Sequence, residues 1–279
     1  MPVSHSDSSK PSAALQEWRW HAGKGTVIWQ LMFLDSGQPV GMKRVAAERS
    51  VSLFCLDAEN GDLLCDDFVL TVGSESALPV GEGWMSGLET THGGLVFCHG
   101  YLSGTPEHLG IWAVDLPGQR VVWSRPELVF AANLGSSFLV YRTRSFAGFP
   151  EREYWLLDPE TGAETEHLGT GHERPNLLRG SAPGEELRQR IVLPVARQES
   201  GVAVECIDSA PFRIEARHTY CPEGGTWSSE IAVLTQERSI YRELMVAGSL
   251  RPLFDNFMTR GSSLYYIKEK EELVSVRIA

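Results

Sequence analysis

The densest group of side chains able to do chemistry lies between residues 92 and 108. It contains three histidines, a cysteine and a glutamate: His92, Cys98, His99, Glu107 and His108. Imidazole with carboxylate or thiolate is a usual zinc set, and a hairpin would bring His99 and His108 together. The spacing matches no zinc signature, however, and Cys98 and His99 would point to opposite faces of a strand. We therefore expect no metal and no other cofactor, and interpret the group as ligand contacts or as polar residues that order a loop.

Aromatic and basic residues extend this candidate site. Trp112, Trp123 and Trp155 fall on repeated strands, where core packing explains them, whereas Trp84 lies outside the repeats and suits an exposed platform. Arg142 and Arg144 belong to a basic, aromatic segment that suits an anionic ligand or a partner's carboxylates, although a solvated loop is the alternative. The predicted ligand-binding residues are Trp84, Glu89, His99, Tyr101, Glu107, His108, Arg142 and Arg144.

No catalytic residue is predicted. A glycosidase needs a unique pair of carboxylates, yet Asp57, Asp115 and Asp158 occupy the same place in successive repeats, which is typical of an architectural role. The segment 83–87 is not a G-x-S-x-G elbow, and the Gly-rich segments at 23–25 and 224–226 do not have phosphate-loop spacing.

The elements that must position these residues are short apolar runs of strand length, separated by turn signals. We predict strands over 27–33, 52–56, 94–97, 111–114, 138–140, 153–157, 190–193, 202–207 and 264–267. The segment Ser239–Ala247 has apolar residues four apart, which fits a helix, but its β-branched and aromatic content favours a strand. The region 169–189 is too irregular to assign.

An internal repeat organises these runs: apolar residues, Asp, a short turn with Gly, and then further apolar positions. Copies begin around Asp57, Asp115 and Asp158, and weaker ones around Asp208 and Lys268. Each copy predicts a β-hairpin, because Asp bonds turn amides and Gly supplies a positive φ. The copies are about 43 to 60 residues apart, near the length of a four-stranded propeller blade.

The fold prediction is therefore all-β: a single β-propeller of five blades, with six as the alternative. We assign residues 16–279 to this domain and residues 1–15, which are rich in Ser and Pro, to a flexible tail. The last strand, ending at Ile278, should pair with the segment Trp18–Trp20 and close the ring.

The hairpin unit, in which Trp follows the turn, resembles the repeats of quinoprotein-type bacterial propellers. More specifically, Trp84–Glu89, His99–Tyr101, Pro106–Ile111 and the Asp115 hairpin resemble a bacterial family known only as a domain of unknown function. The resemblance covers about residues 50–168 and implies a propeller-like protein without an assigned activity. Cys65, where Trp is expected, and Lys268, in place of Asp, depart from the repeat.

Composition limits the function further. Among 279 residues, 25 Lys and Arg against 36 Asp and Glu give a net charge of −11, which argues against nucleic acid and anionic membranes as partners. The five cysteines predict free thiols, and the N-terminus has no signal-peptide pattern, so we expect a cytoplasmic protein. We interpret the chain as a non-catalytic module that binds a protein partner or a small ligand. The alternative is a hydrolase-like or lyase-like enzyme with a central-channel site.

Overall fold

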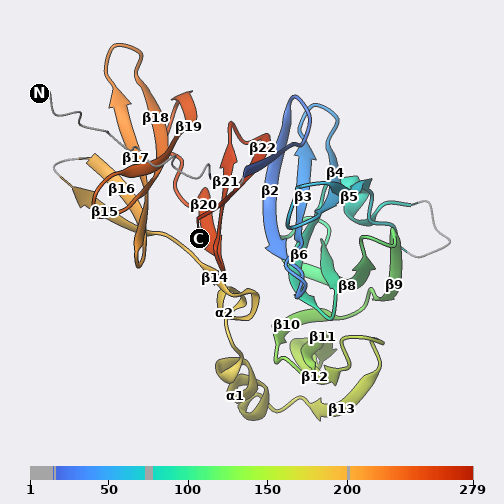
Figure 1. Cartoon of the computed structure of the whole chain (residues 1–279). Coiled ribbons are helices and arrows are strands. Elements are labelled where there is room, and N and C mark those ends of the chain that lie inside the picture. The colour runs from blue at the N-terminus through green and yellow to red at the C-terminus, as the bar shows by residue number, and fades with distance from the viewer. Residues whose placement is uncertain (1–14, 16, 73–77, 200–201, 279) are drawn as a thin grey trace, which may run out of the picture.

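The chain forms five antiparallel sheets in the part that the computed structural model describes, residues 15, 17–72, 78–199 and 202–278 (Figure 1). The described helices are α1 (Glu173–Ser181) and α2 (Glu185–Gln189), with a 3-10 turn at Val80–Gly83. Neither helix is both long and apolar enough to cross a bilayer. The all-β prediction is confirmed, whereas all but one residue of the predicted tail, 1–15, lie outside the described residues.

Three four-stranded sheets follow one another along the chain. The first sheet contains β2 (Thr26–Phe33), β3 (Pro39–Val45), β4 (Ser50–Leu56) and β5 (Leu63–Phe68). The second contains β6 (Ser86–His92), β7 (Leu95–Tyr101), β8 (His108–Asp115) and β9 (Arg120–Arg125). The third contains β10 (Val129–Asn133), β11 (Phe138–Phe146), β12 (Phe149–Leu157) and β13 (Glu164–Gly169).

The remaining two sheets are interleaved in sequence. The closing sheet has the order β1 (Glu17–His21), β22 (Glu272–Arg277), β21 (Ser263–Lys268), β20 (Phe257–Arg260) and β14 (Ile191–Val192). The fourth sheet contains β15 (Val195–Glu199), β16 (Val202–Ser209), β17 (Phe212–Cys221), β18 (Thr226–Leu234) and β19 (Ser239–Ser249). The predicted pairing of the two chain ends is confirmed, since Trp18 lies opposite Ser275 and Trp20 opposite Leu273.

Buried apolar clusters join the sheets in a fixed spatial order. Separate clusters connect the fourth sheet to the closing sheet, the closing sheet to the first, the first to the second, and the second to the third. None of these clusters of described residues spans the third and fourth sheets, which lie far apart with α1 and α2 between them (Figure 1). The sheets therefore form an open arc and not the closed ring expected from the sequence. In sequence, all strands of the fourth sheet lie between β14 and β20, which are paired neighbours in the closing sheet.

The repeated Asp turns do what the sequence predicts in the first and third sheets. Asp57 accepts the backbone N–H of Glu59 at 2.8 Å, and Asp158 accepts that of Glu160 at 2.8 Å. In the weaker copy, Asp208 instead pairs with a strand residue, Arg197, at 3.1 Å.

A tryptophan from the preceding sheet docks onto two of these turns. The Trp18 indole N–H donates to the carbonyl of Ala58 at 3.1 Å, and that of Trp123 donates to the carbonyl of Pro159 at 3.1 Å. In each turn the ring packs on glycine: a Cβ on Gly61 would lie 2.6 Å from Trp18, and one on Gly162 would lie 2.7 Å from Trp123. The same contact thus joins the closing sheet to the first sheet and the second to the third.

The structure also tests the sequence predictions for residues 239–247 and for the cysteines, and it assigns the region 169–189. The strand prediction for Ser239–Ala247 is confirmed by β19, and the unassigned region 169–189 contains α1 and α2. All five cysteines are free; Cys55 faces Cys65 across paired strands, and burial raises the pKa of the Cys55 thiol to about 12.

A polar network fastens the fourth sheet to the closing sheet. Glu243 of β19 accepts hydrogen bonds from Tyr266 and Lys268 of β21, both at 2.5 Å, and pairs with Arg19 of β1. Burial raises the pKa of the Glu243 carboxyl, but hydrogen bonds from these residues outweigh burial and hold it well below its ordinary value. The carboxylate form is therefore favoured by the fold.

Replacing Gly162 by Ala tests the indole dock. Gly162 has φ +68°, and its new Cβ would lie 2.7 Å from Trp123. Gly148→Ala is the matched control, because Gly148 also has positive φ, +86°, but nothing lies within 4 Å of the Cβ that alanine would add there. We expect the control to cost about 1 kcal/mol of unfolding free energy through backbone strain alone, and Gly162→Ala at least about 1 kcal/mol more. Equal losses in urea titrations would contradict tight docking.

The Glu243 network predicts a defined pH dependence. Because the folded-state pKa is below the ordinary value of 4.5, the carboxylate stabilises the fold above that pH, and the contribution is lost as pH falls toward the folded pKa. Glu243→Gln should cost about 1–3 kcal/mol at neutral pH and clearly less near pH 3. Glu230→Gln, which breaks the exposed pair with Arg242, should change stability by under about 1 kcal/mol. A Glu243→Gln loss independent of pH would refute the assignment.

Candidate functional site

Three adjacent strands of the second sheet bring a carboxylate and two imidazoles together. Glu89 lies on β6, His99 on β7 and His108 at the start of β8. One oxygen, Glu89 Oε1, is 2.7 Å from Nδ1 of His108 and 2.9 Å from Nδ1 of His99. The imidazole rings stack with centroids 3.5 Å apart. We call these three residues the Glu-His-His cluster.

Two irregularities in the sheet produce this convergence. The β6–β7 register shifts between Leu88 and Thr90, so Glu89 is an unpaired bulge residue. The β7–β8 register shifts between Cys98 and Gly100, which leaves His99 unpaired in that ladder. Bulges re-aim side chains, and here they turn both groups toward one point.

The surroundings of the cluster restrain its rings. The Tyr101 ring meets His99 and His108 edge-on, with centroid distances of 5.0 and 5.1 Å. A Cβ at Gly87 would lie 2.6 Å from the His99 imidazole, so only glycine fits there. Tyr101 also lines an adjoining pocket of about 360 Å³ with Met85 and Leu102. As expected from alternation, Cys98 faces away and is buried in the core between the first and second sheets.

The other predicted ligand-binding residues lie apart from the cluster. Arg142 and Arg144 both reach Glu153 on β12, at 3.6 and 2.5 Å, and Arg142 also covers the Trp155 ring at 4.6 Å. Glu107 is exposed, and its charge contributes to raising the Tyr141 pKa, behind the larger effect of burial. Their role in ligand binding stays a prediction.

The predicted aromatic platform, Trp84, is half-buried and covered. Arg44 stacks between two indoles, 4.4 Å from the Trp29 ring and 5.2 Å from that of Trp84. Burial lowers the pKa of the Arg44 guanidinium. Trp29, with 57% of its surface exposed, is the more open of the two indoles.

Helix α2 contacts the first strands of the first and second sheets, β2 and β6. Glu185 accepts a hydrogen bond from Thr90 of β6 at 2.8 Å, and Arg188 donates to the same hydroxyl at 3.2 Å. Gln189 accepts the backbone N–H of Phe33 on β2 at 3.0 Å. These α2 side chains therefore connect the first strands of the first and second sheets by hydrogen bonds.

A second set of potentially catalytic groups is sealed inside the fourth sheet. His218 contacts the Ser229 hydroxyl at 2.8 Å and the Glu205 carboxylate at 3.1 Å. At most 1% of each of these residues is exposed, and Glu205 also accepts the backbone N–H of Asp255 at 2.9 Å. The array resembles a Ser-His-carboxylate triad in composition, but its contacts give it a structural role.

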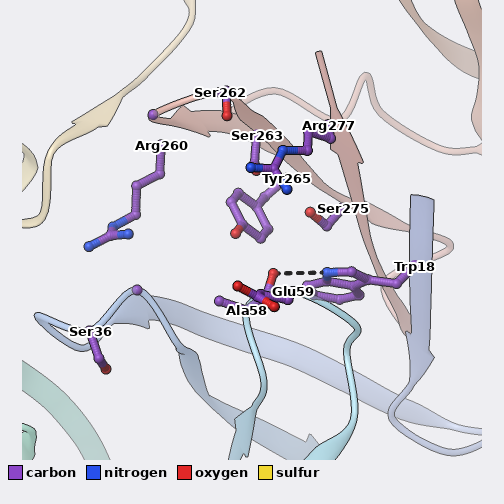
Figure 2. A pocket seen from close by; sticks show the side chains of 12 residues that line it. Trp18, Ser36, Ala58, Glu59, Arg260, Ser262, Ser263, Tyr265, Ser275 and Arg277 are labelled. Carbon is purple, nitrogen blue, oxygen red and sulfur yellow. Dashed lines mark hydrogen bonds between the residues drawn. The ribbon is translucent and has the colours of Figure 1, made fainter. Parts of the chain in front are cut away.

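A pocket of about 250 Å³ lies between the closing sheet and the first sheet (Figure 2). The β20–β21 turn and strands β21 and β22 form one wall, and turns of the first sheet form the other. The lining residues are Trp18, Ser36, Gly37, Ala58, Glu59, Arg260, Gly261, Ser262, Ser263, Tyr265, Ser275 and Arg277. Four serine hydroxyls and two guanidinium groups make it a polar pocket rich in hydrogen-bond donors.

Neither arginine of this pocket pairs with a carboxylate among the described residues. Arg260 donates only to carbonyls, those of Gln189, Leu34 and Asp35 at 3.0, 3.5 and 3.4 Å. The exposed Arg277 side chain makes no hydrogen bond or ion pair with any described residue. The wall therefore carries two positive charges, while Glu59 supplies the one carboxylate among the described lining residues.

Sequence reasoning missed this pocket because its members are scattered from residue 18 to residue 277. The available signal was the run Arg260-Gly261-Ser262-Ser263, a turn rich in donors. Burial raises the pKa of the Tyr265 phenol, and hydrogen bonds with Ser275 and Ser263 partly offset that rise.

Comparisons with known proteins leave the family open. No protein-family model matches the chain, and no curated protein matches it. Among solved structures, one from work on the GH130 family of mannoside phosphorylases aligns with this chain at TM-score 0.33 and 10% sequence identity. The alignment covers 92% of this chain and 84% of that one. A glycosyl hydrolase from Bacteroides ovatus aligns at 0.31 and 10%, with the same coverages of 92% and 84%.

TolB from Acinetobacter baumannii aligns at TM-score 0.21 and 11% identity, covering 91% of this chain and 64% of that one. Similarities at these TM-scores do not establish a shared fold or activity.

Gln189→Ala tests whether α2 holds the sheets together. The substitution leaves the buried N–H of Phe33 without its acceptor, which should cost about 1–3 kcal/mol of unfolding free energy. Leu187→Ala on the same helix is the control, because Leu187 is 74% exposed and its truncation should change stability by about 0.5 kcal/mol or less. Equal, small losses in denaturant titrations would show that the helix is dispensable.

Proposed function

We propose that this chain is a binding module whose pocket, shown in Figure 2, takes a small ligand carrying an oxyanion such as phosphate or carboxylate. The observation that carries this proposal is the pair Arg260 and Arg277, neither of which has a carboxylate partner among the described residues. In a protein of net charge −11, such guanidinium groups suit an external anion.

The size and lining of the pocket narrow the ligand further. A volume of about 250 Å³ favours a small molecule over a protein partner. Ser262, Ser263 and Ser275 offer hydroxyls that can bond to hydroxyl groups of a ligand as well as to its anionic end. A phosphorylated or carboxylated polyol is the ligand class that matches both features.

We also interpret the five sheets as blades of an incomplete propeller. Support comes from the two indole docks, Trp18 on the turn of the first sheet and Trp123 on the turn of the third. The pairing of β1 with β22 adds the N-terminal strand to the last blade, as in propellers closed by their chain ends.

The enzyme alternative has one favourable observation. The Glu89 carboxylate accepts the Nδ1–H of His108 at 2.7 Å, an arrangement that orients an imidazole for proton transfer. A hydrolase of the two-carboxylate type needs two acids in one pocket. Among the described residues, the pocket beside the cluster is lined by one carboxylate, Glu82, and the pocket of Figure 2 also by one, Glu59. Binding therefore has the broader support.

Isothermal titration with glycerol 3-phosphate, and with glycerol as the neutral control, tests the proposal. We expect the phosphate ester to bind, more weakly as salt is added, and glycerol not to bind measurably. Arg277→Gln should weaken binding about tenfold, because it removes one charge-assisted contact. Arg238→Gln is the matched control, since Arg238 is exposed and its side chain has no partner among the described residues. Equal binding by the Arg277→Gln variant, or no binding by the parent protein, would overturn the proposal.

A further inference from the structure

We infer that the Glu-His-His cluster is a binding site for one divalent transition-metal ion, distinct from the pocket of Figure 2. One potential ligand atom from each of Glu89, His99 and His108 lies within 4.8 Å of the others. The sequence alone predicted no metal here, because the residue spacing matches no signature. The two bulges that create the site are not visible in that spacing.

Burial and hydrogen bonding indicate that the site is built for a ligand. Only 2% of the His99 side chain is exposed, yet neither ring nitrogen makes a well-aligned hydrogen bond within the described residues. A buried polar side chain without a hydrogen-bond partner destabilises the fold, so its presence calls for a compensating role. A metal ion bound through Nδ1 would give that nitrogen a partner, and Glu89 Oε1, 2.9 Å away, is placed to be a second ligand.

The donor set selects the class of ion. Two imidazoles and one carboxylate suit Zn²⁺, Co²⁺, Ni²⁺ or Cu²⁺, whereas Mg²⁺ and Ca²⁺ prefer oxygen ligands alone. Three protein ligands leave a fourth position for water or another small ligand. Cys98 is not a fourth ligand, since it is buried in the apolar core on the opposite face of the sheet.

The cluster must open slightly to admit an ion. The two Nδ1 atoms lie 2.7 and 2.9 Å from Glu89 Oε1, whereas tetrahedral ligand atoms about 2.0–2.2 Å from a zinc ion are roughly 3.3–3.6 Å apart. His108 has the most room to shift of the three residues, because 39% of its side chain is exposed, against 12% for Glu89 and 2% for His99. A small shift of the His108 side chain would widen the 2.7 Å separation between its Nδ1 and Glu89 Oε1.

Titration of the full chain with Co²⁺, followed by its visible absorption, tests the inference. We expect one equivalent to bind with the d–d bands of a four- or five-coordinate ion, Zn²⁺ to displace it, and Mg²⁺ to have no effect. His108→Ala should weaken Co²⁺ binding at least tenfold, and because His108 is partly exposed this variant should fold. Glu89→Gln should weaken binding similarly.

His167→Ala is the matched control. His167 also contacts a carboxylate, Glu153 at 2.9 Å, and also stacks on an aromatic ring, that of Trp155, yet it lies outside the cluster. Its removal should leave Co²⁺ affinity unchanged. Absence of stoichiometric binding by the parent protein, or equal loss in the His108→Ala and His167→Ala variants, would overturn the inference.

Discussion

Two of the four junctions between successive sheets depend on the same contact, an indole that lies on the Asp-Gly turn of the next sheet. A tryptophan in this position both donates its N–H to the second residue of the turn and covers the glycine four residues after Asp. The contact needs a residue without Cβ and with positive φ, so the turn and the partner strand constrain each other. Docking of the first sheet on Trp18 also forms one wall of the arginine-lined pocket.

The junction between the first and second sheets has a cysteine, Cys65, at the position of the docking tryptophan, and its turn differs accordingly. Cys65 stands where tryptophan is expected, and Leu116 of the facing turn joins it in a shared apolar cluster. The residue four after Asp115 is Gln119, which keeps the positive φ, at +51°, although it is not glycine. A side chain is tolerated there because, within the part of the chain that the structure describes, no indole donates a hydrogen bond to this turn. Both differences, cysteine in place of tryptophan at 65 and glutamine in place of glycine at 119, therefore follow from the same missing indole contact.

The hairpins and the strand pairing of the chain ends could be predicted because both depend on local turn chemistry and on apolar alternation. The point at which the series of docked sheets ends, after the third sheet, could not be predicted. In the third sheet, position 166, eight residues after Asp158, is Glu166, which pairs with Arg174 of α1 at 2.6 Å in place of docking on another sheet. Likewise, Glu89 and His99 meet only because a bulge interrupts each ladder, and regular alternation gives no sign of a bulge.

Arginines that pair with carboxylates have a structural role, whereas arginines without a carboxylate partner are available to a ligand. In the fourth sheet, Arg213 and Arg217 share the carboxylates of Glu199 and Glu215, and hydrogen bonds to these groups raise the pKa of both guanidinium groups. Thirty-six acidic residues against 25 basic ones make such pairing easy. Arg44 and Arg260 differ from these, since among the described residues each donates only to backbone carbonyls, and the unpaired charge of Arg260 lies on the wall of a pocket. Because an uncompensated charge attracts oppositely charged groups most strongly where solvent access is restricted, the pocket, and not the paired surface arginines, is where an anion gains most by binding.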